Sequence, residues 1–148
     1  MARAPLQINV IPFRKNENGL YEFAVFHRSD GTMWHFVSGG AEDDETAIEA
    51  ANRELKEETG ISTKVNWIKL DSRASIPKTA YPSITHWPKE VLVLPQFSFA
   101  VDASGLEIVL SDEHDAFRWL SFEDATKLLK WDSDKVALWE LNERLKKE

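Results

Sequence analysis

Three glutamates at helical spacing are the residues of this sequence best placed to do chemistry. Glu54, Glu57 and Glu58 stand three and four positions apart, and residues at these spacings are neighbours on an α-helix. Like charges this close repel one another, and partial burial increases the cost. A hard divalent cation such as Mg²⁺ or Mn²⁺ removes the repulsion, because it prefers carboxylate oxygens and water as ligands. The spacing therefore indicates either a metal site or, as is common for acidic helices, an exposed charged face.

The neighbouring residues predict the helix that carries these glutamates. Apolar residues recur at helical spacing along it: Ile48, Ala51 and Leu55. We expect a helix over 44–59 whose apolar face meets the core and whose glutamates border that face. Asp43 or Asp44 can cap its first turn, since a carboxylate accepts free backbone N–H groups. Gly60 stands where a left-handed residue commonly ends a helix.

The rest of the chain predicts an irregular mixture of strands and helices. Strands are expected over 6–13, 21–27, 64–74, 90–101 and 117–120, the first two forming a hairpin. Helices are expected over 121–129 and 132–147. The proline-bearing segment 76–89 is expected to be a loop, and long loops in compact domains are often functional. This order of elements predicts an α/β fold with a mixed sheet and helices on both faces.

Composition restricts the class of protein. A chain of 148 residues fits one domain, spanning 1–148, and the absence of cysteine excludes disulfides and cysteine nucleophiles. The net charge of −7 argues against nonspecific binding of a nucleic acid polymer. No stretch has the apolar core of a signal peptide or the length of a membrane span. We therefore expect a cytoplasmic protein that does not bind membranes, as a monomer or homodimer.

The residues around the glutamates form a longer pattern. Gly39 is followed after five residues by Glu45, and after seven more by the run RELKEETGI, residues 53–61. This pattern resembles the Nudix box, G-x5-E-x7-R-E-U-x-E-E-x-G-U with U an aliphatic residue, at every specified position. The order of strands and helices is also similar to the Nudix α/β/α sandwich with its mixed central sheet, so the resemblance extends over the whole chain.

The resemblance implies a hydrolase that cleaves a diphosphate linkage in a small nucleotide-like molecule with Mg²⁺ or Mn²⁺. It implies that Glu54, Glu57 and Glu58 carry the metal and that Glu54 or Glu58 serves as base. The backbone carbonyl of Ser38 is implied as a further ligand. Metal ions would neutralise phosphate charge and activate the attacking water.

Other positions of the box are implied to support the site. Arg53 and Glu45 resemble the pair that orients the catalytic helix, and this positioning makes Arg53 a candidate for the catalytic machinery. The alternative for this pair is an ordinary surface ion pair, which is worth little. Gly39 and Gly60 are the structural glycines of the box.

A second segment indicates which groups within the family this sequence resembles most. The motif E-H-x-x-x-x-W, found in dihydroneopterin triphosphate pyrophosphohydrolases and in diadenosine tetraphosphate hydrolases, is similar to Glu113-His114 followed by Trp119. By this similarity Glu113 is a fourth carboxylate at the metal site; the alternative is an exposed loop acid. The run WHFVSGG, residues 34–40, resembles the pterin group, and the P-K-G of the diadenosine group is absent. We expect a pterin or nucleoside triphosphate as substrate, with a dinucleoside polyphosphate as second choice.

Six residues outside the carboxylates are candidates for contact with substrate: Arg28, Trp34, His35, Gly40, Lys78 and Tyr81. Arg28 and Lys78 can bind phosphate, a flat ring can stack on Tyr81 or Trp87, and Gly40 allows close backbone approach. The alternatives are a solvated arginine and a plain surface histidine. The other tryptophans are expected to pack in the core: Trp67, Trp131 and Trp139.

A noncatalytic Nudix-type binding or regulatory module is the alternative from another functional class. Such a module is expected to have lost carboxylates of the box, and none is missing here. The sequence therefore favours an enzyme.

Overall fold

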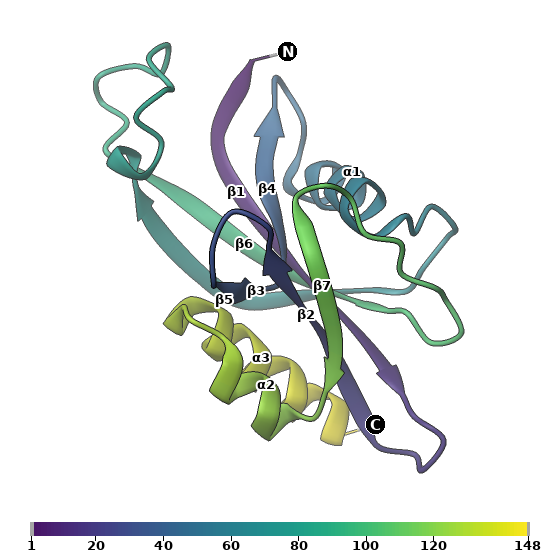
Figure 1. The fold of residues 1–148 in the computed structure, drawn as a ribbon. Helices are drawn as coiled ribbons and strands as arrows, with labels where there is room; N and C mark the ends of the chain where they lie inside the picture. Colours follow the sequence, from purple (N-terminus) through teal and green to yellow (C-terminus); the bar gives the residue numbers. More distant parts are fainter. Residues whose placement is uncertain (1, 148) are drawn as a thin grey trace.

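The structure is a computed structural model that describes residues 2–147. Its centre is a mixed seven-stranded sheet with the order β3-β2-β1-β6-β5, in which β4 pairs with β1 and β7 pairs with β2 (Figure 1). The strands are β1 (Arg3–Lys15), β2 (Tyr21–Arg28), β3 (Trp34–His35), β4 (Val37–Glu42), β5 (Trp67–Pro77), β6 (Val93–Asp102) and β7 (His114–Leu120). The expected mixed sheet is confirmed, since β6 runs parallel to β1 and the other pairs are antiparallel.

The expected N-terminal hairpin is present, with Phe13 opposite Phe23. Its turn is closed by the Asn16 side chain, which accepts two backbone N–H groups, and by Gly19, whose φ is 76°. The third predicted strand starts later and runs further than expected, to Pro77. Proline is tolerated there because β5 is an edge strand. The long loop accordingly spans 78–92 and begins with a 3₁₀ turn, η1 (Lys78–Ala80).

The segment 34–42 changes partners in its middle. Its first part, β3, pairs with β2, and its second part, β4, pairs with β1. Phe36, which separates them, is completely buried. This segment therefore bridges the two halves of the sheet.

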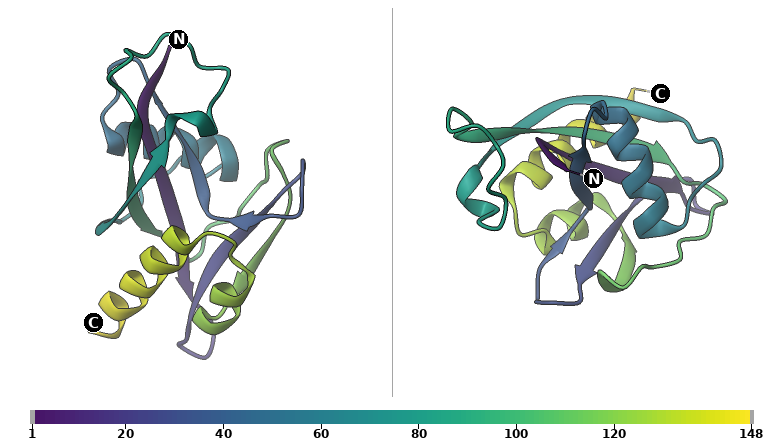
Figure 2. Two further views of the ribbon diagram at one scale, coloured as in Figure 1. Left: turned by 90° about the vertical axis from the view of Figure 1, so that its left-hand side faces the viewer. Right: turned by 90° about the horizontal axis from the view of Figure 1, so that it is seen from above.

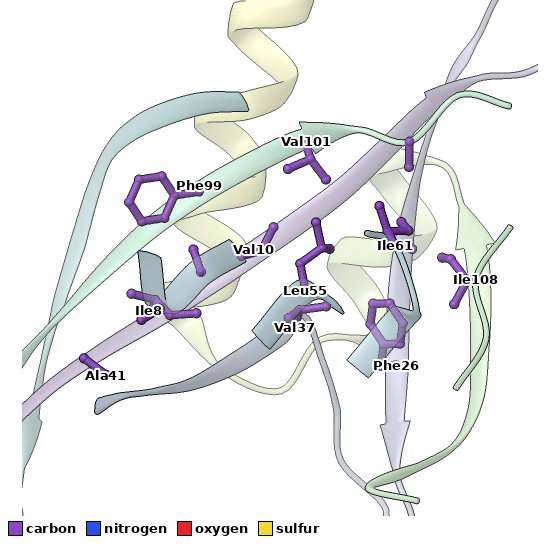
Figure 3. Packing of buried hydrophobic residues seen from close by; sticks show 14 residues of the cluster. Ile8, Val10, Phe26, Val37, Ala41, Leu55, Ile61, Phe99, Val101 and Ile108 are labelled. Atoms are coloured by element: carbon purple, nitrogen blue, oxygen red, sulfur yellow. The ribbon is translucent and has the colours of Figure 1, made fainter. Parts of the chain in front are cut away.

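Helices cover both faces of the sheet, as predicted: α1 (Ala47–Thr59) lies on one face, and α2 (Phe122–Leu128) and α3 (Asp132–Lys146) lie on the other (Figure 2). Because side chains alternate along a strand, Val10 of β1 packs on the α1 side and Ile11 on the α3 side. Figure 3 shows Leu55 of α1 among the buried strand residues on the α1 side of the sheet, which include Val10, Val37 and Val101. No helix of the described chain is both long enough and apolar enough to cross a bilayer.

The start of α1 differs from the prediction. Thr46 is the N-cap: its hydroxyl accepts the N–H of Glu49, and the Glu49 carboxylate accepts the N–H of Thr46 at 2.9 Å. This reciprocal capping box makes the predicted caps, Asp43 or Asp44, wrong. Asp43 instead turns the preceding chain with a φ of 48°. At the other end, Gly60 adopts the expected left-handed conformation.

The buried face of α1 is also rotated from the predicted one. Ala51 and Leu55 are buried, but Ile48 is 41% exposed. The space on the inner face is occupied by Glu54 and Glu58. Two of the three glutamates therefore point inward instead of bordering the core.

Two of the predicted core tryptophans lie outside. Trp131, the N-cap of α3, and Trp139 are about half exposed. Trp139 lies outside the inward stripe of α3, which consists of other residues: Ala137, Leu138, Leu141 and Leu145. Trp67 does pack, edge-on, against Phe99.

Candidate functional site

Arg53 links α1, the acidic helix, to the residues that precede it. Its guanidinium donates two hydrogen bonds to Glu45, at 2.9 and 3.0 Å, and one to Glu54 at 2.9 Å. A further N–H donates to the carbonyl of Gly40 at 2.8 Å. The hydrogen bonds to Glu45 raise the pKa of Arg53 and lower that of Glu45, so this ion pair is strongly coupled. The contacts tie the loop before α1 to the helix itself, which is the geometry that an orienting role requires.

Glu58 is the most deeply buried of the clustered carboxylates. The residue is 1% exposed, and both of its carboxylate oxygens lack a hydrogen-bond partner among the described residues. Burial, followed by the interaction with Glu54, raises the pKa of Glu58. Burial also raises the pKa of Glu54. An unpaired buried carboxylate is costly for a fold, and a bound cation would compensate this cost.

Gly39 makes room for Glu54. A Cβ added at Gly39 would overlap the carboxyl group of Glu54, so only glycine allows the helix side chain to lie against β4 here. Ser38 directly precedes this glycine in β4. The predicted backbone ligand and the carboxylates of α1 are therefore brought to the same place.

Glu113 lies near Glu58, although it belongs to the segment before β7 and not to α1. Ligand atoms of Glu58, Glu113 and His114 lie within 4.8 Å of one another. Glu57, by contrast, has a side chain that is 57% exposed and is turned toward Arg53 at 3.4 Å. Glu58 thus has Glu113 beside it and buried Glu54 one turn away on α1, whereas Glu57 lies at the margin of these carboxylates.

The histidine candidates are paired inside the protein. His35 Nε2 lies 2.9 Å from His114 Nε2, and both residues are buried. His114 Nε2 lies 3.7 Å from Glu58 Oε1. Local sequence does not predict this pair, because the two residues are 79 positions apart and no local pattern joins them.

The remaining candidates lie in two groups. Arg28 is held by Asp30 through two hydrogen bonds of 2.9 Å, and half-buried Trp34 lies under the Arg118 guanidinium at 4.9 Å. Lys78 stands in η1, at the base of the long loop.

The long loop lies against the start of β1. Tyr81 packs edge-on against Trp87, and the Arg3 guanidinium lies 4.7 Å from the Tyr81 ring. Trp87 Nε1 donates to the carbonyl of Arg3 at 2.7 Å, and a Cβ at Gly40 would overlap the Arg3 side chain. Arg3 thus connects the loop with the glycines, although nothing in its sequence context indicated it.

Comparison with known proteins gives a consistent result. A family model for the NUDIX domain matches residues 5–139. The asymmetrical bis(5'-nucleosyl)-tetraphosphatase of Mus musculus is 33% identical over 127 residues, which cover 85% of this chain and 82% of that protein. An RNA pyrophosphohydrolase of Xanthomonas campestris is 31% identical over 114 residues, covering 72% of this chain and 55% of that protein.

Solved structures with the same fold include a NUDIX protein of Listeria monocytogenes, 44% identical, with a TM-score of 0.87 over 97% of this chain and 96% of that one. A Caenorhabditis elegans Ap4A hydrolase complex is 20% identical, with a TM-score of 0.75 over 97% and 98%. The Escherichia coli dihydroneopterin triphosphate pyrophosphohydrolase is 24% identical, with a TM-score of 0.73 over 96% and 99%. At these lower identities the last two show a shared fold.

Proposed function

The chain belongs to the NUDIX hydrolase family, whose members act on phosphoanhydride bonds. We propose that it is a divalent-metal-dependent pyrophosphohydrolase and that its substrate is a small nucleotide-like or pterin triphosphate. The observation that carries the metal dependence is Glu58, a buried carboxylate whose two oxygens have no hydrogen-bond partner among the described residues. A cation supplies the missing partner.

The residues that would hold Mg²⁺ or Mn²⁺ are Glu54, Glu58, Glu113 and the carbonyl of Ser38, with Glu57 at the margin. When bound, the cation neutralises charge on the phosphate oxygens and lowers the pKa of a bound water. All of these donors are oxygens, which is the ligand chemistry that magnesium and manganese prefer.

The protein's own groups then have distinct tasks. Glu54 or Glu58 accepts the proton of the attacking water, since an ordinary carboxylate suffices as base for a water whose pKa has been lowered. Arg53 holds Glu54 in place through its 2.9 Å hydrogen bond and anchors the loop through Glu45. Gly39 allows the helix to approach the strand.

Substrate binding is assigned to groups around this centre. Lys78 and Arg28 offer positive charge to phosphates, and Tyr81 or Trp34 offers a flat surface to a heterocyclic ring. Gly40, which is packed against Arg3, is a further candidate, whereas the ring of His35 is buried against His114. In an acidic protein with a net charge of −7, metal-bridged phosphates explain how an anionic substrate is held.

A dinucleoside polyphosphate is the second candidate substrate. The specific observation in its favour is the mouse tetraphosphatase, which is 33% identical across 85% of this chain. The RNA pyrophosphohydrolase relative adds a 5'-triphosphate RNA as a third compound to test, although the acidic surface disfavours a polymer.

A substrate panel tests the proposal. Dihydroneopterin triphosphate, nucleoside triphosphates, a diadenosine tetraphosphate and a 5'-triphosphate RNA are assayed with Mg²⁺ in ¹⁸O-labelled water, and the products are identified. We expect E57Q and E58Q to lower kcat by about 100-fold or more, with E107Q, at an exposed glutamate, as control. Near-normal turnover in both site variants would refute the metal assignment.

A further inference from the structure

A buried pair of histidines lies behind the candidate metal site. The rings of His35 and His114 are 5.0 Å apart, with 2.9 Å between their Nε2 atoms. A hydrogen bond between two ring nitrogens requires one to carry a hydrogen and the other to offer a lone pair. A charged histidine carries an N–H at both ring nitrogens. A charged His114 would leave the N–H of its buried Nδ1 without a partner among the described residues, and a charged His35 could not accept a hydrogen bond at Nε2. The contacts therefore favour two neutral rings.

The surroundings of the pair decide which nitrogen carries the hydrogen. With a hydrogen on His114 Nε2, the ring donates to His35 Nε2 and also presents a positive edge to Glu58, 3.7 Å away. The hydrogen of His35 then lies on Nδ1, which is 3.3 Å from the hydroxyl of Ser38. A single chain of contacts thus runs from Glu58 through His114 and His35 to Ser38.

The opposite assignment satisfies fewer groups. It would turn a lone pair of His114 toward the carboxylate of Glu58. It would also place an N–H on His114 Nδ1, which is buried and has no partner among the described residues. An unpaired buried N–H is rarer and costlier than an unpaired lone pair. The first assignment is therefore favoured.

We propose that His114 and His35 are positioning residues, whose hydrogen-bonded pair holds Glu58 and Ser38 at a defined separation in the catalytic site. The inference rests on the proposed function, in which Glu58 and Ser38 serve the metal-assisted reaction. Groups that orient ligands in this way commonly change metal affinity or activity 10–100-fold when they are removed. Because Glu113 directly precedes His114, the same pair anchors the fourth carboxylate.

The geometry also separates this role from direct ligation by His114. A ligating nitrogen must direct a bare lone pair at the metal. In the favoured assignment the Nε2 of His114 carries the hydrogen that it donates to His35, so it offers no lone pair to a metal, and its Nδ1 is buried. His114 is therefore a support of Glu58 and not its fellow ligand.

The first test needs neither metal nor substrate. Long-range ¹H–¹⁵N NMR of the imidazole rings, on the metal-free protein at pH 7.5, reports which nitrogen carries the hydrogen. We expect a neutral His114 with its hydrogen on Nε2 and a neutral His35 with its hydrogen on Nδ1. The reverse tautomers, or a charged ring in either residue, overturn the proposal.

The second test uses four variants and a matched control. H114L and H35L remove the hydrogen-bonding nitrogens, and H114Q returns a neutral N–H near the position of Nε2. We expect H114L to lower kcat about 10–100-fold with KM changed less than about twofold, and H114Q to recover most of the loss. We expect the double variant H35L/H114L to be no slower than H114L, because both residues act in one chain. The control is H27Q. His27 also forms a side-chain contact, at 2.6 Å to Asp115, but it takes no part in the contacts that link Glu58, His114, His35 and Ser38.

Each alternative result has a defined meaning. Wild-type kcat in H114L, losses that multiply in the double variant, or equal losses in H114L and H114Q contradict a positioning role. A ¹⁴N coupling to bound Mn²⁺ that disappears in H114Q also contradicts it, because it shows direct ligation. If wild-type and H27Q proteins hydrolyse none of the panel, the proposed function fails, whereas the NMR measurement still decides the tautomers. Thermal unfolding of every variant separates a loss of kcat from a loss of folded protein.

Discussion

Replacement of Asp134 by asparagine should stabilise the protein, and more so at higher pH. Asp134 lies in the first turn of α3, is 5% exposed, and has one side-chain partner, the Nδ2 of Asn9 at 3.2 Å. Burial raises the pKa of Asp134 from 3.8 to about 7. The opposing hydrogen bond from Asn9 is too weak to reverse this shift. The folded protein therefore binds a proton at Asp134 more tightly than the unfolded chain does.

The sign and size of the effect follow from linkage. Because the folded pKa lies above the unfolded one, stability is lost as pH rises from about 4 to about 7, and the full penalty persists above that range. A shift of this size corresponds to a penalty of about 4 kcal/mol at pH 8 and about 2 kcal/mol at pH 5, to order of magnitude. D134N removes the charge, and its amide can donate to Asn9 Oδ1, which is buried without a partner among the described residues.

Urea unfolding of wild type and D134N at pH 5, 6, 7 and 8 measures the effect. We expect D134N to have the larger free energy of unfolding at pH 8, with an advantage that shrinks toward pH 5. The matched control is D132N, an exposed aspartate in the same helical turn, which should change stability by at most a few tenths of a kcal/mol at every pH. An advantage that is absent at pH 8, or that does not depend on pH, would refute the reasoning.

Three further substitutions test other parts of the structure. G39A should lower kcat at least about 10-fold, because the added methyl group displaces Glu54. The control is G31A, where a Cβ meets nothing within 4 Å. Equal rates of the two variants in steady-state assays would contradict this prediction. T46A should lower the free energy of unfolding by about 1 kcal/mol in urea titrations, and an unchanged midpoint would show that the capping box is not stabilising. R53K should lower kcat about 10–100-fold, because lysine lacks the planar fork that bonds Glu45 twice; kcat within twofold of wild type would count against the orienting role.

Features encoded by local sequence were predicted well. Gly60 ends α1 in a left-handed conformation, as expected. The helix expected from residue 121 is α2, and Ser121 caps it by accepting the N–H of Asp124. In both cases the relevant groups lie within a few residues of each other, so the spacing alone carries the information. The convergence of Glu54 and Glu58 on one helix face follows from the same local geometry.

Features that depend on distant partners could not be predicted from periodicity. Hydrophobicity ranks Ile48 as a core residue above Glu58, yet the structure exposes the isoleucine and buries the glutamate. Only a tertiary arrangement can compensate a buried carboxylate, and no window of sequence contains it. The pairing of His35 with His114 is hidden for the same reason.

The change of partner at Phe36 makes the length of the segment 34–42 a strict requirement. Successive strand residues face opposite sides of a sheet, so deletion of a single residue there would invert the side on which every later side chain emerges. His35 is aligned by β2, whereas Ser38 and Gly39 are aligned by β1. Both alignments can be satisfied together only by one spacing. Loops elsewhere can tolerate insertions, but at this crossing a shift of one position would separate the two halves of the proposed site.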